Sequence, residues 1–283
     1  MPKLTTANHD RDSAGLTYVY PVISRRSGGL SIGINLNPNN ACNWRCVYCQ
    51  VPGLTRGAAP DIDLILLEDE LTGLLEDALH GGFYERYQLP AEQRVIRDIA
   101  ISGNGEPTSS PQFDAAVGVI GQACAEFDLF GAAKLVLISN GSLMHKPEVQ
   151  RGVAHWSELG GEVWFKLDRA TEAGVSQVNN VHFTPEAALT RLEACATLCP
   201  TWVQTCMFAV DDAPPDAAEV AAYLDCLAEA RRRGLPLEGV LLYGLARPSM
   251  QAEAPRLAAL PGEWLEHLAR RIEALGWPVK VSA

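Results

Sequence analysis

Short runs of apolar and β-branched residues alternate along the chain with longer segments of helical periodicity. Six such runs predict β-strands, at 31–36, 97–102, 134–139, 162–167, 202–209 and 239–244. Segments with apolar residues at helical spacing predict helices, at 61–82, 110–127, 146–159, 184–198, 214–234 and 262–276. A strand followed by a helix, repeated six times, predicts a parallel sheet with crossover helices.

The strand pattern fits two architectures. The run "GVLLYG" at 239–244 is apolar almost throughout, which is typical of a strand buried on both faces. A closed or partial barrel and an open doubly wound sheet both contain such strands. In either architecture ligands bind beyond the carboxyl ends of the strands, so we expect the chemistry in the residues that follow each run.

Polar, glycine and cysteine residues do follow these runs. They occur at "NPNNACNWRCVYCQ" (37–50), "GNGEPTSSP" (103–111), "NGS" (140–142), "DRA" (168–170) and "LARPSM" (245–250). The sequence therefore predicts a functional site at one rim of the sheet.

Composition narrows the class of protein. The chain has 283 residues, which suits one large domain, and 47% of them are hydrophobic. No apolar run approaches the roughly 20 residues that a membrane helix needs. The polar segment 1–15 lacks the apolar core of a secretory signal, so we expect a cytoplasmic protein in a reducing compartment, where cysteines favour metal binding or catalysis over disulfides. The net charge of −11 disfavours a nucleic acid partner, because phosphate contacts depend on Lys and Arg.

Cys42, Cys46 and Cys49 stand four and three positions apart in the first rim segment. A structural zinc ion normally takes four ligands, and with no His in this loop a distant residue would have to supply the fourth. A redox pair would explain Cys46 and Cys49 but leave Cys42 unused. A [4Fe–4S] cluster normally takes four thiolates, so three would leave one iron open to a reactive ligand. We favour the cluster, with the other two readings as alternatives.

The stretch "CNWRCVYC" resembles the cluster loop of the radical S-adenosylmethionine superfamily, in which the methionine end of the cofactor chelates the fourth iron. The resemblance runs from residue 18 to the end of the chain and implies a partial (β/α)6 TIM-like barrel over 31–283, with a C-terminal helix and strand and an N-terminal extension over 1–30. The most similar branch is that of the 4-demethylwyosine synthases of tRNA wybutosine synthesis. Those enzymes carry a second cluster on upstream cysteines and bind tRNA, whereas this chain is acidic and has no Cys before Cys42.

The same resemblance implies which residues bind the cluster and the cofactor. Three cysteines would hold the metal: Cys42, Cys46 and Cys49. Ten residues would bind S-adenosylmethionine: Tyr48, Gly103, Asn104, Gly105, Glu106, Ser139, Asn140, Leu242, Tyr243 and Gly244. Asn104 departs from the second glycine of the family's motif. For Glu106 a solvent-facing turn is the alternative, and for Asn140 simple turn chemistry.

Candidate catalytic residues are Lys166, Asp168 and Arg247. Lys166 and Asp168 occupy alternate positions at a strand end and are expected to point the same way. They would form a buried ion pair, or Lys166 would hold a carboxylate or form a Schiff base with a carbonyl compound. Arg247 would anchor an anionic substrate. Arg25 and Arg26 would do the same or, as the alternative, lie on the surface.

The implied function is reductive cleavage of S-adenosylmethionine by a [4Fe–4S] cluster, giving a 5′-deoxyadenosyl radical that abstracts hydrogen from a small or nucleoside-like substrate. An electron donor such as flavodoxin or ferredoxin would act with it. A tRNA-modifying wyosine-type enzyme and a non-catalytic iron–sulfur or zinc protein are the alternatives. Three further cysteines are expected to pack as small apolar residues, with an auxiliary cluster as the lesser alternative: Cys195, Cys199 and Cys206.

Overall fold

One curled sheet forms the centre of the protein. The computed structural model describes residues 4, 14–24 and 28–282. The strands of this sheet are β1 (Val19–Ser24), β2 (Gly29–Ile34), β5 (Ile96–Ile101), β6 (Lys134–Ser139), β7 (Glu162–Lys166), β8 (Thr201–Val210), β9 (Leu237–Gly244), β10 (Leu257–Ala259) and β11 (Val279–Ser282). They lie in the order β1, β2, β5, β6, β7, β8, β9, β11, with β10 paired to β8. The β1–β2 and β8–β10 pairs are antiparallel and the others are parallel.

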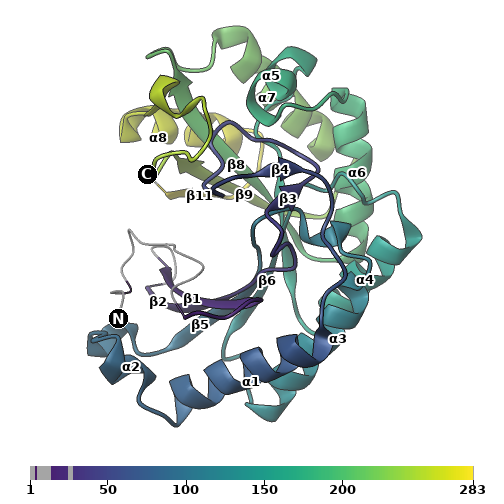
Figure 1. Ribbon diagram of the computed structural model, residues 1–283. Coiled ribbons are helices and arrows are strands. Elements are labelled where there is room, and N and C mark those ends of the chain that lie inside the picture. Colours follow the sequence, from purple (N-terminus) through teal and green to yellow (C-terminus); the bar gives the residue numbers. More distant parts are fainter. Residues whose placement is uncertain (1–3, 5–13, 25–27, 283) are drawn as a thin grey trace.

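Helices cover the outer side of the sheet. They are α1 (Leu64–Leu79), α2 (Phe83–Arg86), α3 (Phe113–Glu126), α4 (Pro147–Glu158), α5 (Glu172–Asn179), α6 (Pro185–Leu198), α7 (Ala217–Arg232) and α8 (Gly262–Glu273). Figure 1 shows the sheet bending around a hollow, with α1, α3, α4 and α6 along its convex side. This is a half-barrel of parallel strands, so the predicted partial barrel is confirmed.

All six predicted strands are present, as β2, β5, β6, β7, β8 and β9. Strand β1 was not predicted, and it pairs with β2 although it falls in the segment assigned to the N-terminal extension. The division into 1–30 and 31–283 stays a prediction. Helices α2 and α5 were not predicted either, and α5 proves important for the site.

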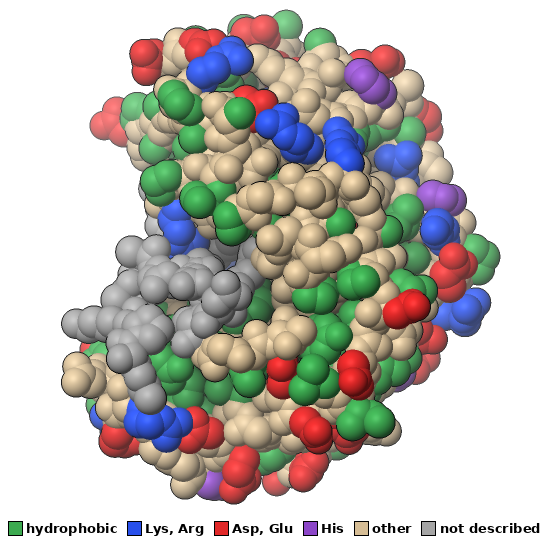
Figure 2. All heavy atoms as spheres, viewed as in Figure 1, with side chains coloured by type: hydrophobic (Ala, Val, Ile, Leu, Met, Phe, Trp, Pro, Cys, Tyr) green, Lys and Arg blue, Asp and Glu red, His purple; other side chains and the backbone are tan. Residues whose placement is uncertain are grey.

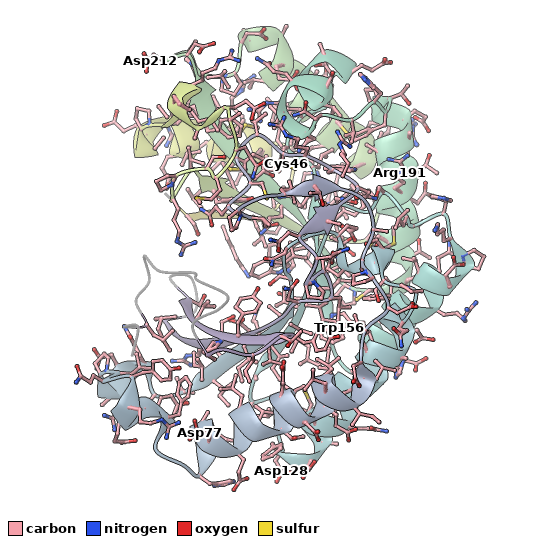
Figure 3. The ribbon with its side chains drawn as sticks, in the orientation of Figure 1. Cys46, Asp77, Asp128, Trp156, Arg191 and Asp212 are labelled. Carbon is pink, nitrogen blue, oxygen red and sulfur yellow. The ribbon has the colours of Figure 1, made fainter. Side chains whose placement is uncertain are left out.

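The core lies between the sheet and its helices. The indole of Trp156, on α4, is fully buried there and donates to the Glu162 carbonyl over 3.3 Å. Figure 3 contrasts this residue, near the helices, with Cys46, inside the curve of the sheet. Helix ends follow ordinary capping: the Asp63 carboxylate accepts from the amides of Ile65 and Leu66 at the start of α1.

The inner face of the sheet carries polar and aromatic side chains. Tyr20, on β1, crosses this face, because a Cβ on Gly33 would lie 2.1 Å from the Tyr20 Cζ. The Tyr20 hydroxyl donates to the Ser102 carbonyl over 3.1 Å. Strand β1 therefore contributes to the wall of the hollow.

The surface agrees with the acidic composition. On the face in Figure 2, Asp and Glu side chains lie along both the upper and the lower edge, and several Lys and Arg side chains lie together in the upper half. Within residues 14–24 and 28–282, no helix combines the length and apolar character required to cross a bilayer.

Candidate functional site

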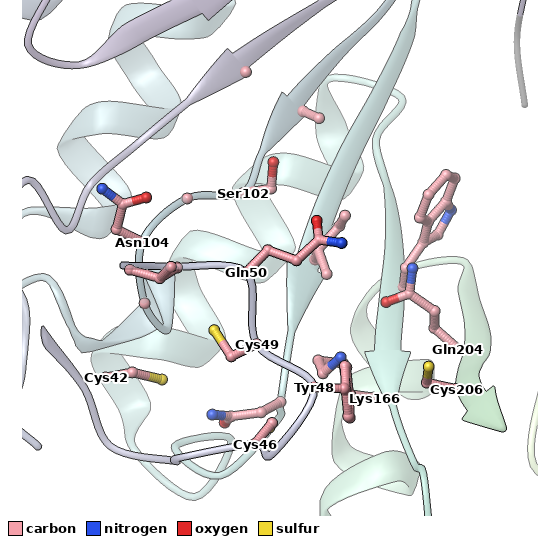
Figure 4. A pocket seen from close by; sticks show the side chains of 18 of the residues that line it. Cys42, Cys46, Tyr48, Cys49, Gln50, Ser102, Asn104, Lys166, Gln204 and Cys206 are labelled. Atoms are coloured by element: carbon pink, nitrogen blue, oxygen red, sulfur yellow. The ribbon is translucent and has the colours of Figure 1, made fainter. Parts of the chain in front are cut away.

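A cavity of about 340 Å³ opens at the rim where the parallel strands end. Thirteen of the residues singled out from the sequence line it: Cys42, Cys46, Tyr48, Cys49, Gly103, Asn104, Gly105, Glu106, Asn140, Lys166, Tyr243, Gly244 and Arg247. Figure 4 shows the three cysteines together at one side of this cavity. Segments from five separate parts of the chain thus meet at one place.

Three other predicted residues lie behind the cavity wall. Ser139 is 1% exposed and Asp168 is 1% exposed, and both support residues that do line the cavity. Leu242 is fully buried in the main core. The predicted Arg25 and Arg26 lie outside the described residues.

The cysteine loop is fixed by segments far away in the chain. It begins at the short strand β3 (Ala41–Cys42), which pairs with β4 (Thr55–Arg56). The Met250 amide donates to the Cys49 carbonyl over 2.9 Å, and the Ser249 hydroxyl donates to the Val47 carbonyl over 2.7 Å. The segment after β9 therefore holds the loop in place.

Two thiols of this loop, those of Cys42 and Cys46, favour the protonated state. Burial raises the pKa of Cys42 to about 11 and the pKa of Cys46 to about 12. Metal binding to such thiols requires their deprotonation and releases protons.

The donor set fits a multinuclear cluster better than a single ion. In the part of the chain that the structure describes, no three His, Cys, Asp or Glu side chains gather closely enough to hold one metal ion. Cys42, Cys46 and Cys49 nevertheless line the same cavity, and a cluster distributes its thiolate ligands over several irons. Cys42, Cys46 and Cys49 as ligands of a [4Fe–4S] cluster stay a prediction, and so does the mononuclear zinc alternative.

Asp168 holds the cysteine loop against the sheet. Its carboxylate accepts from the Tyr48 hydroxyl at 2.5 Å, from the Asn179 side-chain amide at 2.9 Å and from the Cys206 backbone amide at 2.9 Å. The Asn179 Nδ2 also lies 3.2 Å from the Cys46 Sγ. One buried carboxylate therefore orients both an aromatic ring of the cavity and a candidate metal ligand.

Helix α5 accepts backbone hydrogen bonds from the loop on both sides of Cys46. The Arg45 amide donates to the Asn179 carbonyl over 3.2 Å, and the Val47 amide donates to the Val178 carbonyl over 2.8 Å. Sequence reasoning missed Asn179, because this segment follows the fourth predicted strand without a strong helical pattern.

Glu106 is buried, not a solvent-facing turn residue. It is 2% exposed, and its Oε1 accepts from the Thr108 hydroxyl at 2.6 Å and the Ser139 hydroxyl at 2.7 Å. Its Oε2 accepts from the Asn140 amide at 2.7 Å. Burial raises the pKa of Glu106, although these hydrogen bonds lower it. Because Oε2 accepts only one of these bonds, it retains a lone pair for a cationic ligand.

The glycines beside Glu106 allow close packing. A Cβ on Gly103 would lie 2.4 Å from the Asn35 Oδ1, and a Cβ on Gly105 would lie 2.1 Å from the Ala41 carbonyl oxygen. Asn104, at the departure from the family motif, donates its side-chain amide to the Asn40 Oδ1 over 2.6 Å. This turn therefore packs against the start of the cysteine loop.

Asn140 links the cysteine loop to the segment after β6. Its Nδ2 donates to the Asn43 Oδ1 over 2.9 Å, and its Oδ1 accepts from the Ser142 hydroxyl at 2.6 Å. Turn chemistry and a position on the cavity wall therefore coincide in this residue.

Lys166 is a half-buried cation of the cavity wall. Its Nζ lies 4.9 Å from the centre of the Tyr48 ring. Burial lowers the pKa of Lys166, but Tyr243, Asp168 and two cysteines raise it more, so the pKa lies well above its usual value. Asp168 attracts the Lys166 charge without direct contact, since no salt bridge joins the two among the described residues.

Several residues of the cavity had no signal in the sequence. Gln50, Trp164 and Gln204 line it, and Cys206, expected to pack as an apolar residue, lines it while only 1% exposed. Cys195 and Cys199 are buried among core residues, and within the described chain they join no metal-binding group. The auxiliary cluster therefore gains no support.

Comparison with known proteins agrees with this geometry. No family model matches the chain. A protein described as UPF0026 protein, from Helicobacter pylori, is 29% identical over 137 residues, which make up 47% of this chain and 37% of that protein. The chain thus matches little more than a third of this relative's length.

Two solved structures share most of the fold. A radical SAM methyltransferase from Sphaerobacter thermophilus has a TM-score of 0.57 at 12% identity, covering 93% of this chain and 68% of that one. A structure of TYW1 with a bound lysine–pyruvate adduct has a TM-score of 0.55 at 14% identity, covering 86% of this chain and 73% of that one. The resemblance predicted from the cysteine motif is therefore confirmed at the level of the fold: this chain has the curled partial barrel of the radical S-adenosylmethionine enzymes, with a three-cysteine loop at its rim.

Proposed function

We propose that this protein binds a [4Fe–4S] cluster and S-adenosylmethionine and acts as a radical enzyme. Bound together, the two groups supply one-electron reductive cleavage of the sulfonium, which gives a 5′-deoxyadenosyl radical that takes hydrogen from a substrate. The observation that carries this proposal is the cavity itself, in which three cysteines of one loop face the segments that follow β5, β6 and β9. A protein that only held metal would have no need of the segments that face the cysteines.

The proposal gives each part of the cavity wall a role. Cys42, Cys46 and Cys49 would hold the cluster. The Glu106 carboxylate would accept a hydrogen bond from the cofactor's ammonium group, using the free lone pair of its Oε2. The Tyr48 ring would pack beside the adenine.

The cationic side of the cavity would bind a carboxylate. Lys166 stays protonated, because its pKa lies well above the usual value. It would therefore hold the carboxylate of the cofactor or of the substrate. The inner wall of the half-barrel and the cysteine loop would keep water away from the radical.

The substrate we propose is small or nucleoside-like, and the electron donor is a flavodoxin or ferredoxin. The net charge of −11 supports a substrate other than a large nucleic acid.

The test is an assay of cofactor cleavage. Protein reconstituted anaerobically with iron and sulfide is incubated with dithionite and S-adenosylmethionine, and 5′-deoxyadenosine is quantified. We expect product from the wild type and from Cys124→Ala, a control that removes a buried thiol of α3 away from the cavity. We expect none above background from Cys42→Ala. A wild type no more active than Cys42→Ala would refute the proposal.

Metal analysis of the same samples addresses the non-catalytic alternative. Iron near four atoms per chain supports the cluster. Zinc in its place, with one iron or fewer per chain, would support a structural metal protein on this scaffold.

A second candidate is a wyosine-type enzyme. TYW1 is described with a lysine–pyruvate adduct, and Lys166 is the lysine that lines the cavity here. The raised pKa of Lys166 opposes a Schiff base, which forms from the neutral amine. Borohydride trapping with labelled pyruvate and a mobility shift with bulk tRNA at low salt test this candidate. We expect no label on Lys166 and no mobility shift. A labelled Lys166 or a shift would favour the wyosine-type enzyme.

A further inference from the structure

Two side-chain amides reach into the cavity without a protein partner. Gln204, on β8, is 3% exposed and lines the cavity. Gln50, directly after Cys49, lines it from the cysteine loop. Figure 4 shows them extending into the same space from opposite sides. Across the described part of the chain, no hydrogen bond joins either carboxamide to another residue.

The Gln204 carboxamide opens to the cavity and has no hydrogen-bond partner among the described residues. It offers one carbonyl acceptor and two N–H donors to a ligand. A carboxylate alone would satisfy only the N–H half, and an ammonium group only the carbonyl half. A ligand that presents a donor beside an acceptor pairs with both the carbonyl and an N–H of Gln204.

The neighbours of Gln204 indicate the shape of that ligand. Lys166 on β7 stands opposite Gln204 in the parallel register, and Trp164 lies two residues earlier on the same face of the strand. The Trp164 indole nitrogen donates to the Glu162 Oε1 over 2.9 Å, which anchors one edge of the ring. Trp164 also lines the cavity, so an aromatic side chain lies on the strand next to the one that carries the carboxamide.

The adenine is proposed at a different part of the cavity, beside Tyr48. Tyr48 packs in one cluster with Tyr243, near the end of β9. Gln204 instead lies two residues before Cys206 on β8, deeper inside the sheet. A ligand at Gln204 would thus sit below the cofactor.

We propose that Gln204, with Gln50 and Trp164, forms the substrate subsite and binds a planar heterocycle that carries a carbonyl next to a ring N–H, as guanine and uracil do. The heterocycle pairs its N–H and carbonyl with the Gln204 carboxamide, and its face contacts Trp164. This inference rests on the proposed function, which requires a substrate beside the cofactor.

Binding measurements test the subsite directly. Reconstituted protein is saturated with S-adenosylmethionine, so that the cofactor's own pocket is filled, and equilibrium dialysis measures its affinity for guanosine and uridine. An acyclic amide, N-acetylglycinamide, and an anion, pyruvate, serve as the other arms. We expect guanosine or uridine to bind more tightly than both.

Variants identify the residue responsible. Gln204→Leu is expected to weaken nucleoside binding about 10- to 100-fold, because two hydrogen bonds are lost. Gln204→Glu keeps an acceptor but loses the donor, so we expect an intermediate loss. Gln177→Leu changes an exposed glutamine of α5 and should bind like the wild type.

Two results would overturn the inference. One is tighter binding of the acyclic amide or pyruvate than of either nucleoside. The other is wild-type nucleoside affinity in both Gln204 variants; should Gln204→Leu not fold, as judged by circular dichroism, Gln204→Glu alone decides.

The inference and the proposed function fail separately. A wild type that produces 5′-deoxyadenosine but binds no nucleoside would refute the subsite and leave the radical chemistry. A wild type that binds uridine through Gln204 but cleaves no cofactor would refute the radical chemistry and leave the subsite.

Discussion

Glu106, after β5, and Asp168, after β7, are two buried carboxylates at the same rim of the sheet. Only Glu106 faces the cavity. Glu106 lines the cavity and joins the segments after β5 and β6 to each other. Asp168 lies behind the wall and joins the cysteine loop to the sheet through Tyr48 and Asn179. Glu106 thus keeps a lone pair for a ligand, whereas both oxygens of Asp168 accept hydrogen bonds from protein groups.

This difference changes how Asp168 is understood. Its predicted catalytic role stays a prediction, but its three donors are all protein groups, and it orients Tyr48 and, through Asn179, Cys46. We therefore interpret it as a positioning residue. The predictions below test whether the two carboxylates differ in this way.

Removing Asp168 should have the largest effect on stability. In Asp168→Ala, the Tyr48 hydroxyl, the Asn179 amide and the Cys206 backbone amide lose their acceptor inside the protein. We expect the free energy of unfolding to fall by about 3 kcal/mol or more, measured by urea denaturation. Asp225→Ala, on the exposed side of α7, should change it by less than about 0.5 kcal/mol. A loss below 1 kcal/mol in Asp168→Ala would remove the anchoring role.

Changing Glu106 should weaken cofactor binding more than it weakens the fold. Glu106→Gln keeps the size and one acceptor oxygen but removes the charge, so the dissociation constant for S-adenosylmethionine should rise about 10- to 100-fold. Equilibrium dialysis measures it. An unchanged affinity would mean that Glu106, like Asp168, only supports the wall.

The same residue predicts a pH dependence. Burial raises the pKa of Glu106 above its usual value of 4.5, and only the ionised form attracts an ammonium group. As the pH falls, protonation therefore begins above that value, and cofactor affinity should decrease in the wild type. In Glu106→Gln the affinity should stay low and flat over the same range.

Asn179 offers a smaller and more specific test. Its amide lies 3.2 Å from the Cys46 sulfur, and hydrogen bonds to the sulfurs raise the reduction potential of a cluster. Asn179→Leu should lower that potential by about 50 mV, a difference of roughly 1 kcal/mol for one electron, measured by a redox titration followed by electron paramagnetic resonance. Iron content should stay at the wild-type value. An unchanged potential would show that the contact with Cys46 is only structural.

Cys195 and Cys199 should give the smallest effect. They lie in the core, so Cys195→Ala with Cys199→Ala should leave the iron content unchanged and reduce stability by about 1–2 kcal/mol. Loss of about half of the iron would instead revive the auxiliary cluster.

The strands of the barrel were predictable because buried parallel strands are continuous apolar runs. Strand β1 was missed because Pro21, which has no N–H to donate, argues against a strand. It lies at the edge of the sheet, where a proline is tolerated. Only the partner strand, not the local sequence, makes this segment a strand.

The rim of the site was predictable from residues that follow each strand, but the directions of side chains were not. Lys166 and Asp168 were expected to point the same way, yet β7 ends at Lys166 and alternation no longer fixes Asp168. Gln204 could not be predicted as a cavity residue from the sequence. It is a single polar residue within an apolar run, and only the curvature of the sheet brings it to the cavity.

The tie between Ser249 and Val47, 202 residues apart in sequence, has a consequence for how the protein assembles. Contacts at such separation form late in folding, because a long loop must close first. The cysteine loop follows the second strand, yet its shape depends on a segment that follows β9. A ribosome must therefore release nearly the whole chain before Cys42, Cys46 and Cys49 take their final positions. The proposed cluster would then enter only a chain that has completed its fold.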